Sequence, residues 1–148
     1  MEDSNFKIRK LRKTDTEKLY KFFNSLSEKT KYFFHPHPFD RKTAENLCSE
    51  KKKNVLRYVL IIDDKIAGYG FLWDLHRDFP SLGICISDDF HGKGLGKILL
   101  DYLINFAKSK NKKGLCLTVY NDNEKALNLY KKVGFEIERI IYSMKLKF

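Results

Sequence analysis

Three glycines spaced two residues apart separate a short apolar run from a long amphipathic segment. Residues 81–87 are mostly apolar and are followed by two aspartates, after which Gly92, Gly94 and Gly96 stand at every second position. From Leu95 onward, apolar residues recur every three or four positions, which is the pattern of a helix that buries one face. This order predicts a strand, a tight glycine turn and the N-terminus of a helix.

The predicted turn has the properties of a site for a phosphorylated ligand. A helix N-terminus presents backbone N–H groups that have no partner within the helix, and it carries a partial positive charge. Glycine lets the backbone approach a phosphate closely and adopt positive φ where a turn needs it. We therefore expect this segment to hold the phosphate groups of a cofactor.

Two common nucleotide-binding motifs do not fit these residues. A dinucleotide-binding turn reads Gly-x-Gly-x-x-Gly near the start of a strand–helix–strand unit, whereas residues 92–96 read Gly-x-Gly-x-Gly and lie past the middle of the chain. A P-loop ends in Gly-Lys followed by serine or threonine, and here Ile98 follows Lys97. Both motifs are excluded by their own chemistry.

The rest of the chain alternates between strand and helix patterns. We predict strands at 6–11, 55–62, 66–75, 81–87, 115–120, 136–142 and 143–148. Asp63 and Asp64 are predicted to form a hairpin-like turn between the second and third of these strands. We predict helices at 16–26 behind a capping Asp15, from Asp40 through Lys51, from Leu95, and between Asn123 and Gly134. Two prolines keep residues 32–39 out of a helix interior. The predicted fold is α/β (α+β), with a predominantly antiparallel sheet and one crossover.

The length and composition are those of one globular domain. The chain has 148 residues, of which 43% are hydrophobic, so we assign residues 1–148 to a single domain with a real core. Its apolar runs are too short to span a membrane, and its first residues are acidic and polar, unlike a secretory signal. We expect a cytoplasmic protein with no membrane partner, in which Cys85 and Cys116 are buried thiols inside strands.

The net charge of +10 comes mostly from lysine. A basic surface attracts nucleic acids, phosphates or acidic partners, but no run of this chain interleaves aromatic and basic residues as a single-strand binder does. Solvated lysines at helix ends account for much of the excess, so we do not expect a nucleic-acid partner.

Two motifs together resemble one protein family. Residues 91–96 read His-Gly-Lys-Gly-Leu-Gly and are similar to the pyrophosphate loop of GNAT-type N-acetyltransferases, Gln/Arg-x-x-Gly-x-Gly/Ala, except at the first position. Residues 123–135 read Asn-Glu-Lys-Ala-Leu-Asn-Leu-Tyr-Lys-Lys-Val-Gly-Phe. They are similar to a second pattern of that family, Asn-x-x-Ala-x-x-x-Tyr-x-x-x-Gly-Phe. The two motifs in the right order are more specific than either alone.

The resemblance implies a fold and a reaction. The fold would be a mixed, mostly antiparallel sheet flanked by about four helices, with a V-shaped cofactor cleft between splayed strands at 81–87 and 115–120. The reaction would be transfer of an acetyl group from acetyl-CoA to a primary amine, by direct attack in a ternary complex. A protein N-terminus or ribosomal protein is one form of acceptor, and a small-molecule amine is another. A non-catalytic acyl-CoA-binding regulatory module and a homodimer both stay open.

The resemblance also implies which residues contact the cofactor. Backbone groups of the strand would bind the thioester and pantetheine, and N–H groups of the loop would bind the pyrophosphate. The implied cofactor residues are Ile84, Cys85, Ile86, His91, Gly92, Lys93, Gly94, Leu95, Gly96, Lys97, Asn123 and Tyr130. In the family, a tyrosine at the position of Tyr130 donates a proton to the departing thiolate, so Tyr130 is the implied catalytic residue.

The amine side of the reaction is less constrained. Some family members carry a glutamate base where this chain has Thr118, so the base stays open among Asp74, His35, His37 and His76. The expected acceptor-site residues are Phe34, His35, Trp73, Asp74 and Tyr120. The His-x-His pair at 35 and 37 alternates with two prolines and has no third ligand nearby in the sequence, so we expect no metal.

Overall fold

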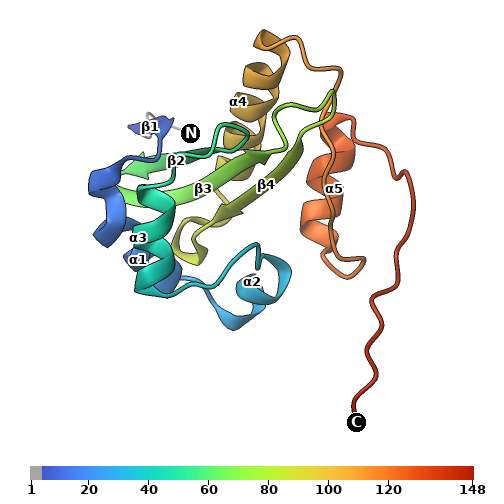
Figure 1. The fold of residues 1–148 in the computed structure, drawn as a ribbon, viewed down its shortest axis with the longest axis horizontal. Helices are drawn as coiled ribbons and strands as arrows, with labels where there is room; N and C mark the ends of the chain where they lie inside the picture. The colour runs from blue at the N-terminus through green and yellow to red at the C-terminus, as the bar shows by residue number, and fades with distance from the viewer. Residues whose placement is uncertain (1–4) are drawn as a thin grey trace. The chain divides into compact units, whose positions relative to one another are not determined.

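The computed structural model describes residues 5–148 and separates them into two compact units at the boundary between Thr118 and Val119. Figure 1 shows the course of the chain. Each unit is described by itself, and the assignment of residues 1–148 to one domain stays a prediction.

The first unit is built on an antiparallel sheet of four strands in the order β1-β2-β3-β4. The strands are β1 (Phe6–Lys10), β2 (Leu56–Ile62), β3 (Lys65–Trp73) and β4 (Ser81–Ile86). Asp63 and Asp64 join β2 to β3 with φ of 49° and 63°. Two successive positive φ values are typical of the tight turn whose twist matches a hairpin. These strands and this turn confirm the predictions.

Helices cover both faces of this sheet. Helix α1 (Thr16–Asn24) and helix α3 (Arg41–Cys48) pack on one face, and helix α4 (Leu95–Ser109) packs on the other. On the first face, Phe22 and Phe23 of α1 join Tyr69 and Phe71 of β3 in one buried cluster. On the other, Leu99 and Leu95 of α4 meet Leu60 and Ala67. The long amphipathic helix predicted from Leu95 is confirmed.

Close packing of α4 depends on a glycine of β3. A Cβ built on Gly70 would lie 3.0 Å from Leu103 and 3.3 Å from Leu99, both on α4. A larger residue would push the helix away from the sheet. The glycine therefore fixes how deeply α4 sits on its face.

The segment between β1 and α3 differs from the prediction. Asp15 ends a short helix, η1 (Lys13–Asp15), and its carboxylate pairs with Arg9 at 2.7 Å in place of capping α1. A short helix α2 (Glu28–Phe33) was not predicted, because its stability comes from the Ser27 cap and not from an apolar face. Helix α3 begins behind Asp40 as predicted but ends at Cys48.

The second unit contains helix α5 (Glu124–Val133), which ends as predicted. Asn123 caps its N-terminus by accepting a hydrogen bond of 3.3 Å from the Ala126 N–H. At the C-terminus Gly134 has φ of 115°, and the Phe135 N–H reaches back to the Tyr130 carbonyl at 2.9 Å. The Tyr130 and Phe135 rings then meet edge to face at 5.6 Å. This is the paired hydrogen-bond and apolar closure expected for a left-handed cap.

Three predicted strands are wrong. The segment 115–120 makes a single parallel bridge, between Cys116 and Ser81, and Cys116 is exposed. Residues 136–142 and 143–148 form no strand, and Ile140 and Tyr142 are 73% and 86% exposed. Alternating apolar residues indicate only which side chains share a face, whereas a strand also needs a neighbouring backbone to take its hydrogen bonds.

Candidate active site

The turn between β4 and α4 has the backbone shape that the sequence predicts. It begins with a short helix, η2 (Asp88–Phe90), and continues through Gly92 and Gly94, whose φ values are 77° and 76°. A Cβ built on either glycine would meet no atom within 4 Å. The backbone conformation therefore explains these two glycines, and the space in front of them is clear for a ligand.

The N-terminus of α4 faces this space with unused donors. Gly94 is the N-cap, and the first helical hydrogen bond joins the Ile98 N–H to the Gly94 carbonyl at 3.3 Å. The N–H groups of the three residues between them, 95–97, have no acceptor within the helix. Lys97 bonds Asp101 one turn on, at 2.7 Å, and Lys93 lies over the Phe90 ring. The backbone therefore offers this turn's directed anion contacts.

His91 stands where the family pattern has glutamine or arginine, and it braces the turn. Its Nε2 lies 2.7 Å from the Ile86 carbonyl oxygen, so the ring donates a hydrogen bond to the last residue of β4. This bond spans the start of the turn and links it to the strand. The departure from the family pattern thus has a structural role of its own.

A second brace joins the turn to α2. The Asp88 carboxylate accepts hydrogen bonds from the Ser27 N–H at 2.9 Å, the Ser27 hydroxyl at 2.8 Å and the Thr30 hydroxyl at 3.1 Å. Burial disfavours the charged carboxylate, but the bonds from Ser27 and Thr30 outweigh it and lower the pKa of Asp88. Asp88, the first residue of η2, therefore anchors α2 to the turn.

The hydrogen bonding of β4 shows which of the three predicted cofactor contacts, Ile84, Cys85 and Ile86, have backbone groups that point away from β3. The Ser87 N–H bonds Ala67 of β3, whereas the Leu82 N–H points away from β3 and bonds Cys116. Because backbone groups alternate along a strand, those of Ile84 and Ile86 also point away from β3. Cys85 pairs with Tyr69 and directs its backbone groups at β3. Of the three, only Ile84 and Ile86 present backbone groups at the outer edge, and the Ile86 carbonyl is taken by His91.

A cavity of about 710 Å³ lies on the face of the sheet that α1 and α3 cover. It is formed by the loop before α3, the C-terminal end of α3, the start of β2 and the end of β3. Its lining residues are Pro36, His37, Asn46, Leu47, Glu50, Lys51, Lys52, Asn54, Val55, Arg57, Trp73, Asp74 and His76. The structure therefore brings the predicted Trp73 and Asp74 together with two histidines.

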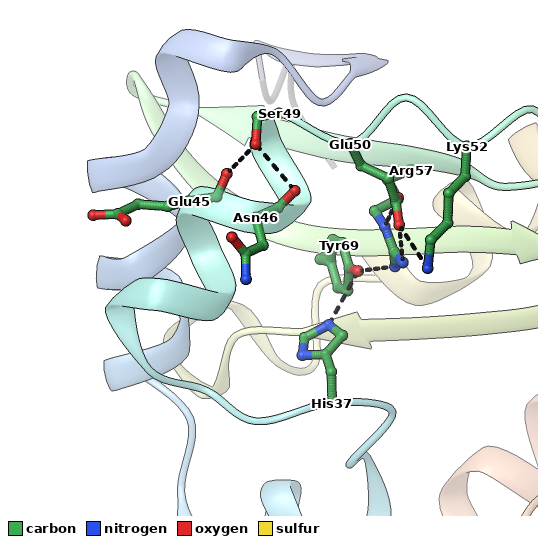
Figure 2. A network of polar contacts seen from close by, with 8 residues as sticks. All are labelled: His37, Glu45, Asn46, Ser49, Glu50, Lys52, Arg57 and Tyr69. Carbon is green, nitrogen blue, oxygen red and sulfur yellow. Dashed lines mark hydrogen bonds and ion pairs between the residues drawn. The ribbon is translucent and has the colours of Figure 1, made fainter.

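A chain of polar contacts forms one wall of this cavity (Figure 2). Arg57 Nε donates to Glu50 at 2.7 Å, and Arg57 Nη1 donates to the Tyr69 hydroxyl at 2.6 Å. Tyr69 in turn lies 3.2 Å from His37 Nε2. The sequence did not indicate Glu50, Arg57 or Tyr69 as site residues, because they come from three separate elements.

Hydrogen bonds at both ring nitrogens fix one tautomer of His37. Its Nδ1 lies 2.8 Å from the Pro38 carbonyl, which can only accept, so Nδ1 carries the proton. Nε2 then accepts from the Tyr69 hydroxyl. Burial lowers the pKa of His37, and the nearby Arg57 charge acts in the same direction. A neutral His37 with both nitrogens engaged orients the loop and is poorly placed to act as a base.

The other predicted acceptor residues separate into different surroundings. Phe34 packs edge to face on Tyr69 and Phe71 within the buried cluster. His35 donates to the Tyr32 carbonyl at 3.0 Å and is not among the cavity-lining residues. Tyr120 lies in the second unit, as do Asn123 and Tyr130. Their grouping with the glycine turn stays a prediction.

Within residues 5–148, no three His, Cys, Asp or Glu side chains lie close enough together to hold a metal ion. No helix in this part of the chain has the length and apolar character needed to cross a bilayer.

Comparisons with known proteins agree with the motifs. The Acetyltransferase (GNAT) family model matches residues 19–135. A putative [ribosomal protein bS18]-alanine N-acetyltransferase of Bacillus subtilis is 30% identical over 96 residues, covering 64% of this chain and 64% of that protein. The L-amino acid N-acetyltransferase AaaT of Escherichia coli is 30% identical over 108 residues, covering 70% and 65%. The chain thus spans just under two thirds of these relatives.

A solved structure extends the likeness to nearly the whole chain. The acetyltransferase of the GNAT family from Streptococcus pneumoniae superposes with a TM-score of 0.75 at 26% identity. The match covers 97% of this chain and 94% of that one. The four-stranded sheet, the glycine turn and the helices around them are therefore parts of a known architecture.

Proposed function

We propose, from the premise that this chain belongs to the GNAT acetyltransferase family, that it transfers an acetyl group from acetyl-CoA to a primary amine. The amine attacks the thioester carbonyl directly in a ternary complex, the amide forms, and CoA leaves as the thiol. The observation that carries the proposal is the turn at Gly92 and Gly94, with its left-handed backbone and clear space before the α4 N-terminus.

The cofactor half of the proposed site follows from that turn. The N–H groups of residues 92–97 hold the pyrophosphate of acetyl-CoA, as the partial charge of the helix end favours. The outward backbone groups of Ile84 and Ile86 run beside the pantetheine as a further strand would. The resemblance of residues 123–135 to the family pattern adds Asn123 and Tyr130 as cofactor contacts, with the Tyr130 hydroxyl supplying the proton that CoA takes up on leaving.

The acceptor half is assigned to the cavity on the face of the sheet that α1 and α3 cover. An amine arrives as an ammonium ion and must lose a proton before attack. Asp74 lines the cavity at the end of β3, next to Trp73 and near His76. We assign Asp74 the role of attracting the ammonium and accepting its proton, directly or through water. Asp74→Asn should lower kcat while leaving acetyl-CoA affinity unchanged.

Relatives suggest which amines to test first. One is named for the alanine of a ribosomal protein and another for L-amino acids. An α-amine is common to both names. We therefore propose an α-amine acceptor, on a protein N-terminus or a free amino acid.

The test begins with the purified protein. Mass spectrometry should find co-purified CoA, and thiol release from acetyl-CoA should follow addition of peptides with N-terminal alanine or of free amino acids. Absence of both cofactor binding and turnover would refute the proposal.

A matched variant separates an enzyme from a non-catalytic binding module. Tyr130→Phe keeps the ring that packs on Phe135 and closes α5, so helix and cofactor binding should persist. The variant should lose about 100-fold in turnover, the low end of the range for a general acid, because a thiol is a good leaving group. Normal turnover by Tyr130→Phe would remove Tyr130 from the catalytic role.

A further inference from the structure

Four lysines from distant parts of the chain surround one hollow at the end of the sheet. The hollow has a volume of about 430 Å³, and its lining contains no acidic residue. The lining residues are Lys10, Lys53, Leu56, Leu75, Phe106, Lys110 and Lys112. Cationic side chains thus stand around an apolar floor.

The fold itself brings these lysines together. Lys10 of β1 pairs with Tyr58 of β2, and the Tyr58 ring packs on Phe106 of α4 at 5.8 Å. The Leu75 N–H bonds the Asn54 carbonyl at 3.1 Å, which ties the segment before β2 to the segment after β3. The arrangement rests on the sheet and on buried aromatic packing, so it is a fixed feature of this face.

The positive charge of the hollow is not balanced from within. Among residues 5–148, none of the four lysines makes an ion pair, whereas neighbouring Lys113 pairs with Asp78 at 3.3 Å. The C-terminus of α4 favours cations near Lys110 and Lys112. That preference does not account for Lys10, which belongs to β1, or for Lys53, which lies in the turn before β2. Four like charges around one hollow favour an anionic partner.

Acetyl-CoA is not this partner. Helix α4 has 15 residues, which at 1.5 Å each separate the hollow at its C-terminal end from the glycine turn by about 22 Å. The hollow therefore serves a different anion.

The chemistry of the lining favours phosphate groups on a polymer. Lysine binds phosphate as a point charge, and several lysines around one hollow can neutralise successive phosphates of a chain and so release its bound counterions. A membrane surface would call for a helix with protruding apolar anchors, but here the apolar residues lie at the floor. The sequence alone did not predict a nucleic-acid partner, because the grouping of these lysines arises only in the fold. We propose that this hollow and its four lysines bind the phosphodiester backbone of a nucleic acid. The site is separate from acetyl transfer and does not depend on that activity.

The test measures binding of a fluorescein-labelled, unstructured oligouridine RNA as a function of KCl concentration. One variant changes Lys10, Lys53, Lys110 and Lys112 to glutamine. A matched control changes Lys21, Lys29, Lys42 and Lys65, which are exposed lysines elsewhere in the first unit. The control removes the same net charge, so a difference between the two variants reports position and not total charge.

Counterion release fixes the expected result. Each single-strand phosphate contact contributes about 0.7 to the slope of log affinity against log salt, so losing four contacts should flatten the slope by about 3. Affinity in about 50 mM KCl should fall at least tenfold for the hollow variant and much less for the control. A variant of Lys110 and Lys112 alone should show about half the change in slope. DNA of matching length should bind with similar affinity, because phosphate contacts carry no sequence information.

Several results would overturn the proposal. One is equal loss in the hollow variant and the control, since general charge would then explain binding. Another is the absence of salt-dependent RNA binding by the wild-type protein. A third is tighter binding to phosphatidylserine vesicles or to a poly-glutamate peptide than to RNA, with loss in the hollow variant. Acetyl-CoA binding and the thermal midpoint, measured on every variant, verify that each is folded.

Discussion

Replacing Gly94 with aspartate, and separately with asparagine, tests the cofactor turn most directly. The two side chains have nearly the same shape, and both tolerate the left-handed backbone better than other residues. At Gly94 φ is 76°, and a Cβ would meet no atom within 4 Å. Both variants should therefore fold, and they differ only in one negative charge.

The charge should act in opposite directions on stability and on binding. A carboxylate at the N-terminus of α4 interacts favourably with the helix dipole, by about 0.3–1 kcal/mol. The same carboxylate about 5 Å from a bound phosphate repels it, by about 1 kcal/mol in water-like surroundings and about 3 kcal/mol at a dielectric constant near 20. The aspartate variant should thus bind acetyl-CoA about 5- to 150-fold more weakly than the asparagine variant, while unfolding at an equal or higher temperature.

Isothermal titration calorimetry with acetyl-CoA at low and high salt measures the difference. Screening should reduce the gap between the variants when KCl is raised to about 0.5 M. Equal affinities of the aspartate and asparagine variants at low salt would refute the assignment of this turn to the pyrophosphate. A lower thermal midpoint for the aspartate variant would contradict the reasoning about the helix end.

Three further changes test the scaffold. A Cβ at Gly83 would lie 2.1 Å from the Phe71 ring, so Gly83→Ala should destabilise the protein by about 1–3 kcal/mol in urea unfolding; an unchanged midpoint would disprove the contact. Burial opposes ionisation of Asp15, but its bond to Arg9 prevails and lowers the carboxyl pKa. The stabilisation by this carboxylate is thus present above about pH 4 and lost as pH falls further. Asp15→Asn should cost about 3 kcal/mol near pH 7, with the gap to wild type narrowing in acid; a constant gap would argue against the pair. At Gly134 φ is 115°, so Gly134→Ala should lower the helicity of α5 measured by NMR, at a cost of about 1 kcal/mol.

The pattern of the sequence was sufficient where a feature depends on a few neighbouring residues. The left-handed turn at Gly92 and Gly94, the hairpin turn at 63–64 and both caps of α5 were all predicted. Each is set by backbone dihedrals and by hydrogen bonds that span at most five positions. The residue type at each of these positions is therefore enough to predict the turn or the cap.

The predictions failed where a feature depends on which distant segments meet. The alternation of residues 136–148 resembles that of β2 and β3, yet these residues form no strand. The sequence predicts that Asp15 caps a helix, but its carboxylate forms an ion pair with Arg9 of β1 instead. The sequence predicts that Cys116 is a buried strand residue, but its segment makes only one bridge, to Ser81, and Cys116 is exposed.

The sequence by itself determined the glycine turn, the helix that follows it and the family to which the chain belongs. Only the tertiary structure decided that Glu50, Arg57, Tyr69 and His37 form one wall of a cavity. It also decided that lysines of β1 and of the end of α4 share a hollow. The physical reason is the range of the interactions. Dihedral preferences and caps act within a helical turn, whereas burial and charge act between whatever surfaces the packed sheet brings together.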